Sequence, residues 1–211
     1  MLRSLSRVIA GLSLLLTAGL AQTAPILIVD GTGKLTGARN VDVGGILYHV
    51  DFRDGTCVGL FSGCDTPVTD FAFTTSADAS AAGAALLAQV FLDGVQGQFD
   101  TNPSLVAGCS NSIFLCEALI PYAMNQIPGF DGVHIGDVQN FINQAQDKVT
   151  DVNTFRNGDT TTTASNDAVW AVFSRASVPE PPTYACLLLA GIALAMSRRR
   201  NRNRAGQHQR L

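Results

Sequence analysis

Apolar segments flanked by arginines occupy both ends of this 211-residue chain, and they limit the part that can fold as a domain. At the N-terminus, Arg3 and Arg7 precede an apolar stretch, residues 8–20, which is followed by Ala-Gln-Thr-Ala-Pro. This order of charged, apolar and small residues is typical of a secretory signal peptide. We expect residues 1–21 to be removed by cleavage after Ala21. The alternative, a buried N-terminal helix, is disfavoured because the run is short and uncapped.

The C-terminal end has a Pro-Glu-Pro segment, an apolar run and an arginine run, in that order. The residues that carry this pattern are Val178, Pro179, Glu180 and Pro181, then residues 184–196, then Arg198, Arg199 and Arg200. Prolines keep a helix from extending upstream, so the apolar helix begins after them. At about 1.5 Å per residue this helix spans roughly 20 Å, less than the ~30 Å hydrocarbon core. The sequence therefore predicts a marginal transmembrane anchor with its arginines on the cytoplasmic side.

Between these ends, residues 22–177 are enough for one domain with its own core. Residues 22–197 hold six cations and all seventeen acids, a formal charge of −11, while the other eight arginines lie in the two ends. Nucleic-acid binding needs cations clustered on the folded surface. The acidic body therefore excludes nucleic acid as a partner, and the basic ends are better interpreted as topology signals.

Four of the five cysteines form two pairs of equal spacing, Cys57 with Cys64 and Cys109 with Cys116. In an exported body such pairs favour disulfides, and four cysteines allow three connectivities. We prefer the local pairs because each closes a short loop. A zinc site is the alternative, but neither pair has a histidine beside it. Cys186 lies in the C-terminal apolar run and has no expected disulfide role.

Short strands separated by turns are predicted between residues 25 and 53, at residues 26–29, 40–43 and 46–52. In the last of these, Tyr48, Val50 and Phe52 share one face and alternate with polar residues, which indicates a half-buried strand. Residues 168–173 are apolar on both faces and predict a central, covered strand that includes Trp170.

Two amphipathic helices are predicted as well. The first follows Thr75 and ends near residues 93–94, and the second covers residues 137–149, where apolar residues recur every three or four positions. Prolines at 103, 121 and 128 predict loops between them. The expected fold class is therefore α+β: a small antiparallel sheet with two main helices, flanked by a cleaved signal peptide and a C-terminal transmembrane sorting helix.

The C-terminal segment, residues 178–211, resembles the PEP-CTERM sorting signal. The matching parts are Val178 to Pro181, the apolar run and Arg198 to Arg200, although the eleven residues after the arginine run are longer than is usual for that family. The resemblance implies processing by an exosortase, a membrane enzyme of Gram-negative bacteria that also make exopolysaccharide. It implies a chain that is a substrate: exported by the secretory translocon and signal peptidase, held transiently in the inner membrane, and sorted to the cell surface or extracellular matrix.

Chemistry-bearing motifs in the body are weak. His49 and Asp51 share a strand face, but no nucleophile elbow or free nucleophilic cysteine accompanies them, so a solvated sheet face is the better interpretation. Residues 151–153 begin like a calcium loop, yet Phe155 stands where an oxygen ligand is needed. Residues 30–33 are glycine-rich but lack the ending of a phosphate loop and predict a turn.

The sequence therefore predicts a non-enzymatic exported surface or matrix protein with no cofactor and no metal site, associated with exopolysaccharide or biofilm. An exported hydrolase and a carbohydrate- or ice-binding module are the alternatives. Exposed aromatic residues would favour sugar binding, and flat threonine arrays would favour ice binding. Trp170 is expected in the core, and the threonines at 160–163 are too few and unrepeated for an ice-binding array.

Overall fold

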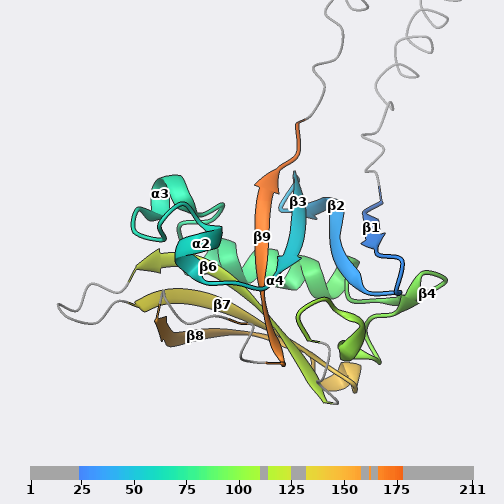
Figure 1. The fold of residues 1–211 in the computed structure, drawn as a ribbon. Helices are drawn as coiled ribbons and strands as arrows, with labels where there is room; N and C mark the ends of the chain where they lie inside the picture. The colour runs from blue at the N-terminus through green and yellow to red at the C-terminus, as the bar shows by residue number, and fades with distance from the viewer. Residues whose placement is uncertain (1–23, 110–113, 125–131, 158–161, 163–165, 178–211) are drawn as a thin grey trace, which may run out of the picture. The chain divides into compact units, whose positions relative to one another are not determined.

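A computed structural model describes residues 24–109, 114–124, 132–157, 162 and 166–177, with the side chains of 151–157 excepted. The predicted signal peptide with its cleavage position at Ala21, the sorting motif, the apolar helix and the arginine run all lie outside these residues. The described residues make up the domain between the two ends, whose fold is drawn in Figure 1.

A seven-stranded mixed sheet forms the domain, with strand order β1-β2-β3-β9-β6-β7-β8. Neighbouring strands are antiparallel except β6 and β9, which pair in parallel. A separate two-stranded hairpin joins β4 and β5. The strands are β1 (Ile26–Val29), β2 (Leu35–Val43), β3 (Ile46–Arg53), β4 (Asp93–Gly94), β5 (Gly97–Gln98), β6 (Leu115–Met124), β7 (Gly132–Phe141), β8 (Lys148–Asn157) and β9 (Ala168–Arg175).

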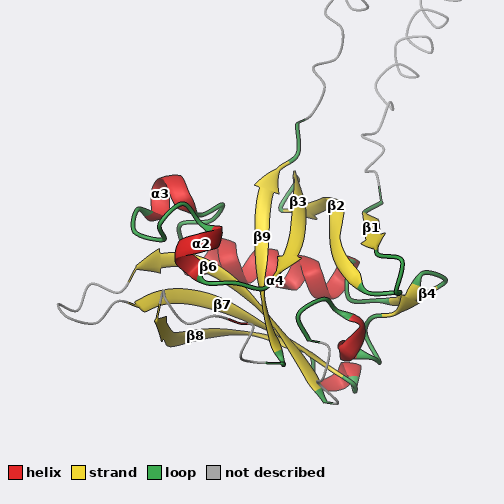
Figure 2. Ribbon diagram, in the orientation of Figure 1, coloured by secondary structure: helices red, strands yellow, loops and turns green. Residues whose placement is uncertain are grey.

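The main helix of the described domain is α4 (Ser76–Gln89), which crosses one face of the sheet (Figure 2). Its N-cap is Thr75, whose hydroxyl accepts a hydrogen bond from the Asp78 backbone N–H and donates one to the Asp78 carboxylate. The helix predicted after Thr75 is thereby confirmed, but it ends at Gln89, and residues 93–94, near its predicted end, form strand β4. The shorter helical elements are α2 (Cys57–Leu60), α3 (Pro67–Asp70), η1 (Pro103–Leu105) and η2 (Gln144–Gln146).

Both faces of the sheet carry a buried core. On one face Tyr48, Val50 and Phe52 pack with α4, as their alternation predicts, and all three are at most 5% exposed. On the opposite face Leu119 and Trp170 pack against the segment that contains α2 and α3. Neighbours along one strand fall into different cores, as they must in a pleated strand: Ala118 joins the first and Leu119 the second.

Strand β9 lies at the centre of the sheet, between β3 and β6, and residues 168–171 are buried. The prediction of a central, covered strand with Trp170 in the core is confirmed. The sheet itself is larger than predicted and mixed where an antiparallel sheet was expected, and the described domain has one main helix where two were predicted.

The second predicted helix, residues 137–149, is wrong. The chain there forms the end of β7, the short turn η2 and the start of β8, and Val138 pairs directly with Val149 across the hairpin. Val138 and Val149, eleven positions apart, therefore lie opposite each other because a turn reverses the chain between them. The turn is favoured by Asn143, whose side chain accepts a hydrogen bond from the Ala145 backbone N–H.

Pro121 was expected in a loop and instead lies within β6. The register between β6 and β7 shifts between Pro121 and Ala123, and β6 pairs with β9 over Glu117–Leu119 but not at Pro121. A proline has no N–H to donate, so it is tolerated at a bulge beside an unpaired strand edge. Pro103 begins η1 as a loop proline, and position 128 lies outside the described residues.

Candidate functional site

The two cysteine pairs are local disulfides, Cys57–Cys64 and Cys109–Cys116, each with a Cα–Cα distance of 5.6 Å. The preferred connectivity is therefore confirmed. These four thiols are not available to hold zinc. Disulfides persist in oxidising compartments, so they indicate an extracytoplasmic location.

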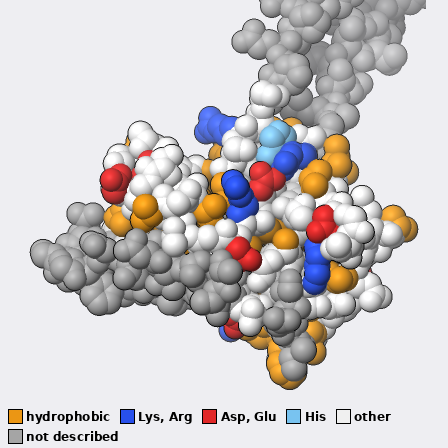
Figure 3. Space-filling model, in the orientation of Figure 1, with side chains coloured by type: hydrophobic (Ala, Val, Ile, Leu, Met, Phe, Trp, Pro, Cys, Tyr) orange, Lys and Arg blue, Asp and Glu red, His pale blue; other side chains and the backbone are white. Residues whose placement is uncertain are grey.

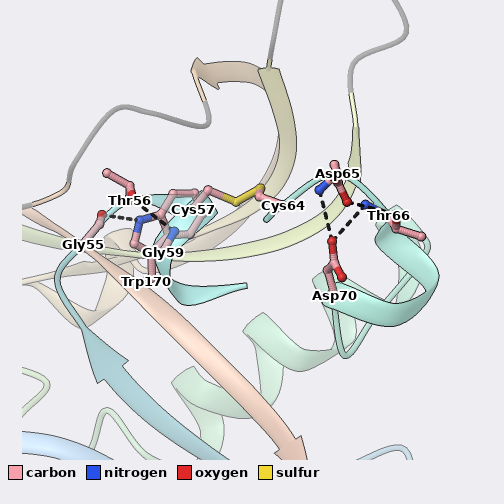
Figure 4. Close-up of a disulfide and its surroundings, with 9 residues drawn as sticks. All are labelled: Gly55, Thr56, Cys57, Gly59, Cys64, Asp65, Thr66, Asp70 and Trp170. Atoms are coloured by element: carbon pink, nitrogen blue, oxygen red, sulfur yellow. Dashed lines mark hydrogen bonds between the residues drawn. A yellow bond between two sulfur atoms is a disulfide. The ribbon is translucent and has the colours of Figure 1, made fainter. Parts of the chain in front are cut away.

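The first disulfide belongs to a cap over the core residue Trp170 (Figure 4). The indole Nε1 donates a hydrogen bond of 3.0 Å to the Gly55 carbonyl, and Thr56 caps α2 by accepting from the Gly59 N–H. Asp70 accepts hydrogen bonds from the backbone N–H groups of Asp65 and Thr66. The disulfide and these bonds fix a segment that has little regular secondary structure of its own.

A polar patch covers the part of the sheet that the cap leaves open, on the face opposite α4. It consists of Arg39 on β2, His49, Asp51 and Arg53 on β3, and Ser174 on β9, and we call it the open face. Figure 3 shows positive, acidic and histidine side chains gathered there. The face carries two of the six cations of an otherwise acidic body.

The open face does not bring His49 and Asp51 together as an acid–base pair. The Asp51 carboxylate accepts a 2.7 Å hydrogen bond from Arg39, in an ion pair whose side chains are 34% and 48% exposed. His49 Nδ1 instead accepts from the Asn40 backbone N–H at 3.4 Å. Arg53 makes no ion pair with the described part of the chain and is exposed to solvent.

A cluster of three aspartates joins the segment after β5 to the turn between β7 and β8. Asp93 accepts hydrogen bonds from the backbone N–H groups of Asp100 and Thr101, at 3.0 and 3.1 Å. Asp147 accepts one from the Phe141 N–H at 2.7 Å, and its carboxyl is near enough to that of Asp100 to share a hydrogen bond when one of the two is protonated. We call Asp93, Asp100 and Asp147 the carboxyl cluster.

The three members of the carboxyl cluster differ in their affinity for a proton. Burial, followed by repulsion from Asp147 and Asp93, raises the pKa of Asp100 to about 6. Burial also raises the pKa of Asp147. The pKa of Asp93 is lowered, because the hydrogen bonds from Thr101 and Asp100 outweigh its desolvation. Asp100 and Asp147 therefore bind a proton more readily than an ordinary aspartate, and Asp93 binds one less readily.

The other candidate motifs have structural explanations. The glycine-rich segment after β1 is a turn, as predicted: Asp30 accepts hydrogen bonds from the backbone N–H groups of Thr32 and Lys34. These bonds, that of Lys34 foremost, lower the pKa of Asp30. Residues 151–153 lie in the backbone of strand β8. In the described residues no group of three or more His, Cys, Asp or Glu could hold a metal ion.

Sequence reasoning missed the carboxyl cluster. Asp100 and Asp147 are 47 positions apart, and each stands in a polar local context that is typical of an ordinary loop. Their contact depends on the β6–β7–β8 register, which the expected helix at 137–149 obscured. With a β7–β8 hairpin in place of that helix, the turn at Asp147 would be a candidate partner for buried polar groups.

Comparisons with known proteins give no match: no family model, no curated protein and no solved structure is similar to this chain. No helix among the described residues is long and apolar enough to cross a membrane.

Proposed function

We propose that this chain is a non-enzymatic surface or extracellular-matrix protein of a Gram-negative bacterium. It is made as an inner-membrane-anchored precursor, and an exosortase processes its PEP-CTERM tail to pass it to the cell surface. The alternatives are an exported hydrolase and a carbohydrate- or ice-binding module.

The observation that carries this proposal is the position of the domain boundary. The last strand, β9, ends at Arg175, and the compact unit ends at Ala176, two positions before Val178 opens the tail motif. Everything that the described core needs therefore precedes the tail. Processing within or after Pro-Glu-Pro would release a domain that keeps its whole sheet and both disulfides.

Tail processing is tested by expressing the chain in hosts with and without an exosortase and weighing the surface and inner-membrane forms by intact mass spectrometry. With the enzyme, we expect protein that lacks residues from about Tyr184 onward; without it, the full tail stays in the inner membrane. Replacing Pro179, Glu180 and Pro181 with alanine removes the recognition element and lets helix extend upstream, so processing should stop.

The matched control is Ser177→Ala, which lies just before the motif and should leave processing unchanged. Deleting Arg198 to Arg200 should act differently, by weakening the positive-inside stop and letting the segment slip across the membrane. Surface protein that still ends in Leu211 in the exosortase-bearing host would refute the sorting function.

We further propose exopolysaccharide as the external partner, with the open face as the contact surface. Arginine and histidine on this face offer hydrogen-bond donors to carboxylate or hydroxyl groups, in a body that otherwise repels anions. The processed body should co-sediment with the host's own polysaccharide, and Arg53→Ser should weaken this more than Lys148→Ser, which lies on β8. Equal binding by both variants would exclude the open face.

A further inference from the structure

Three side-chain attachments hold the segment between β5 and η1, one from the β4–β5 hairpin and two from the β7–β8 part of the large sheet. The Asp93 carboxylate accepts hydrogen bonds from the backbone N–H groups of Asp100 and Thr101 in this segment. Asn140 on β7 donates a 2.8 Å hydrogen bond to the Phe99 carbonyl. The third attachment joins the carboxyls of Asp100 and Asp147. Two of these attachments persist at any ordinary pH, whereas a bond between two carboxyls needs a proton.

Asp100 is poorly placed to carry a negative charge. The residue is 5% exposed, and its Oδ1 atom is buried without a hydrogen-bond partner. An ionised carboxylate in such a position is left partly unsolvated, whereas the protonated form can donate its proton to Asp147. Geometry therefore favours the neutral form of Asp100 in the folded domain.

No nearby cation offsets this preference among the residues that the structure describes. The charged groups that act on Asp100 are Asp147 and Asp93, both acidic. Lys148 on β8 has its ammonium 6.0 Å from the centre of the Phe141 ring and does not act on Asp100. The adjoining η1 contributes Asn102 and Ser104, which hydrogen-bond to each other and do not titrate. The Lys34 ammonium donates a hydrogen bond to the Ser104 carbonyl and is not among the charged groups that act on Asp100.

We propose that Asp100 and Asp147 form a proton-dependent latch that fastens the segment after β5 to the β7–β8 turn in mildly acidic surroundings and loosens when the pair loses its shared proton. The occupant of the latch is a single proton, held between the two carboxyl groups. An exported domain meets the pH of the medium directly, so the latch would respond to that pH. This inference does not depend on how the tail is processed.

The direction of the pH dependence of stability follows from the raised proton affinity of Asp100. The pKa of Asp100 rises from an ordinary 3.8 to about 6 on folding, so the folded state binds more protons than the unfolded state between these values. The stabilisation that protonated Asp100 contributes is therefore fully present below about pH 4 and is lost as pH rises through about 6. A shift of this size changes the folding equilibrium roughly a hundredfold.

The other described carboxyl groups with shifted pKa values do not oppose this effect in the pH range where Asp100 titrates. The pKa values of Asp30, Asp70 and Asp93 are lowered by hydrogen bonds, so their stabilisation is lost only as pH falls below the ordinary aspartate range. Asp147 is raised and acts in the same direction as Asp100. Among the described groups with a shifted pKa, the latch pair should therefore have the largest effect on stability from about pH 4.5 to 7.5.

The latch is tested by urea unfolding of the disulfide-bonded domain from about pH 4.5 to 7.5, in the wild type, Asp100→Asn and Asp147→Asn. An asparagine amide can donate to the remaining carboxylate without a titrating proton. We expect the wild type to lose stability as pH rises and Asp100→Asn to lose most of that dependence. Asp147→Asn should lose only part of it, because burial still raises the pKa of Asp100 in that variant. The matched control is Asp65→Asn, an exposed aspartate with a local hydrogen bond, which should keep the wild-type slope.

A second measurement on the unaltered domain keeps the test independent of how the variants fold. Carbon-13 NMR titration of the aspartate carboxyls should show one group that titrates near pH 6 and moves to lower pH in Asp147→Asn. Titration of every aspartate near its ordinary value would overturn the latch. So would stabilisation of the wild type but not Asp100→Asn by millimolar calcium at neutral pH, because the pair would then hold a cation.

Discussion

The two disulfides close loops of the same length, and this permits a controlled test of what each contributes. Each joins cysteines separated by seven positions, but they lie in different cores. The perturbation is replacement of one pair at a time by alanine, in the variants C57A/C64A and C109A/C116A. A loop-length effect must be equal in the two variants, so any difference between them arises in the folded state.

The magnitude follows from loop length. In the chain-entropy account, a cross-link over about seven residues stabilises the folded state by about 2.4 kcal/mol at 25 °C. With a urea dependence of about 2 kcal/mol/M for a domain of this size, each variant should unfold at a midpoint about 1.2 M lower. Buried sulfur contacts add to this cost, because all four cysteines are at most 2% exposed.

The assay is urea unfolding followed by the fluorescence of Trp170, the single tryptophan of the chain. Its side chain is fully buried, and it packs in the same core as the first disulfide, with the Phe61 ring 5.6 Å away. C57A/C64A should therefore change the native emission of Trp170 as well as the midpoint. C109A/C116A lies in the other core and should change the midpoint alone.

Reduction of the wild type provides the control, since it opens both loops without changing the sequence. Because the pairs lie in separate cores, their effects should add to about 5 kcal/mol. A midpoint that does not move in either variant would refute the loop-closure reasoning. Unequal losses with unchanged native fluorescence would refute the assignment of the difference to packing around Trp170.

Three further changes test how the sheet is held together. Gly83→Ala should destabilise the domain by about 1 kcal/mol. The new Cβ would lie 2.8 Å from Val138 Cγ2. The overpacking costs about 1–3 kcal/mol, which exceeds the gain of about 1 kcal/mol in helix propensity. A raised melting temperature would contradict this, and Ala84→Gly on the exposed side calibrates the propensity term. Asp51→Asn should change stability by less than about 1 kcal/mol, because its ion pair with Arg39 is solvent-exposed; a larger loss in urea unfolding would contradict this. Deleting residues 168–177 should leave a chain without cooperative unfolding by circular dichroism, since β9 joins the two halves of the sheet; a retained sigmoidal transition would contradict it.

Local sequence patterns were sufficient to predict those elements whose pattern is compatible with a single type of structure. Strict alternation at Tyr48, Val50 and Phe52 fits a strand with one buried face, and a short apolar run at residues 168–173 fits a strand covered on both. Thr75 with Asp78 marks the start of α4. The cysteine pairs could be assigned because short loops between cysteines favour local closure.

The hairpin of β7 and β8 was misinterpreted because its pattern has two explanations. Val138 and Val149 are eleven positions apart, which places them on one face of a helix and equally opposite each other in a hairpin. The length of the segment could not distinguish a helix from a hairpin, because β7 and β8 together are as long as a helix with flanking loops. Composition could have: asparagine and glutamine are frequent around the turn, and Asn143 favours a turn through its own side chain.

The strand order of the sheet could not be predicted from any local sequence pattern. The central strand, β9, is the last element of the domain, and it joins β1–β3 to β6–β8 by pairing with β3 on one side and β6 on the other. Neither half can complete its core until residues 168–175 are present, so the contacts that define the fold are long-range and form late. A chain exported unfolded through a translocon meets this requirement only after its whole body has crossed. The tail that follows Ala176 would hold the domain at the membrane at that stage, which fits our proposal that tail processing releases a domain with its whole sheet and both disulfides.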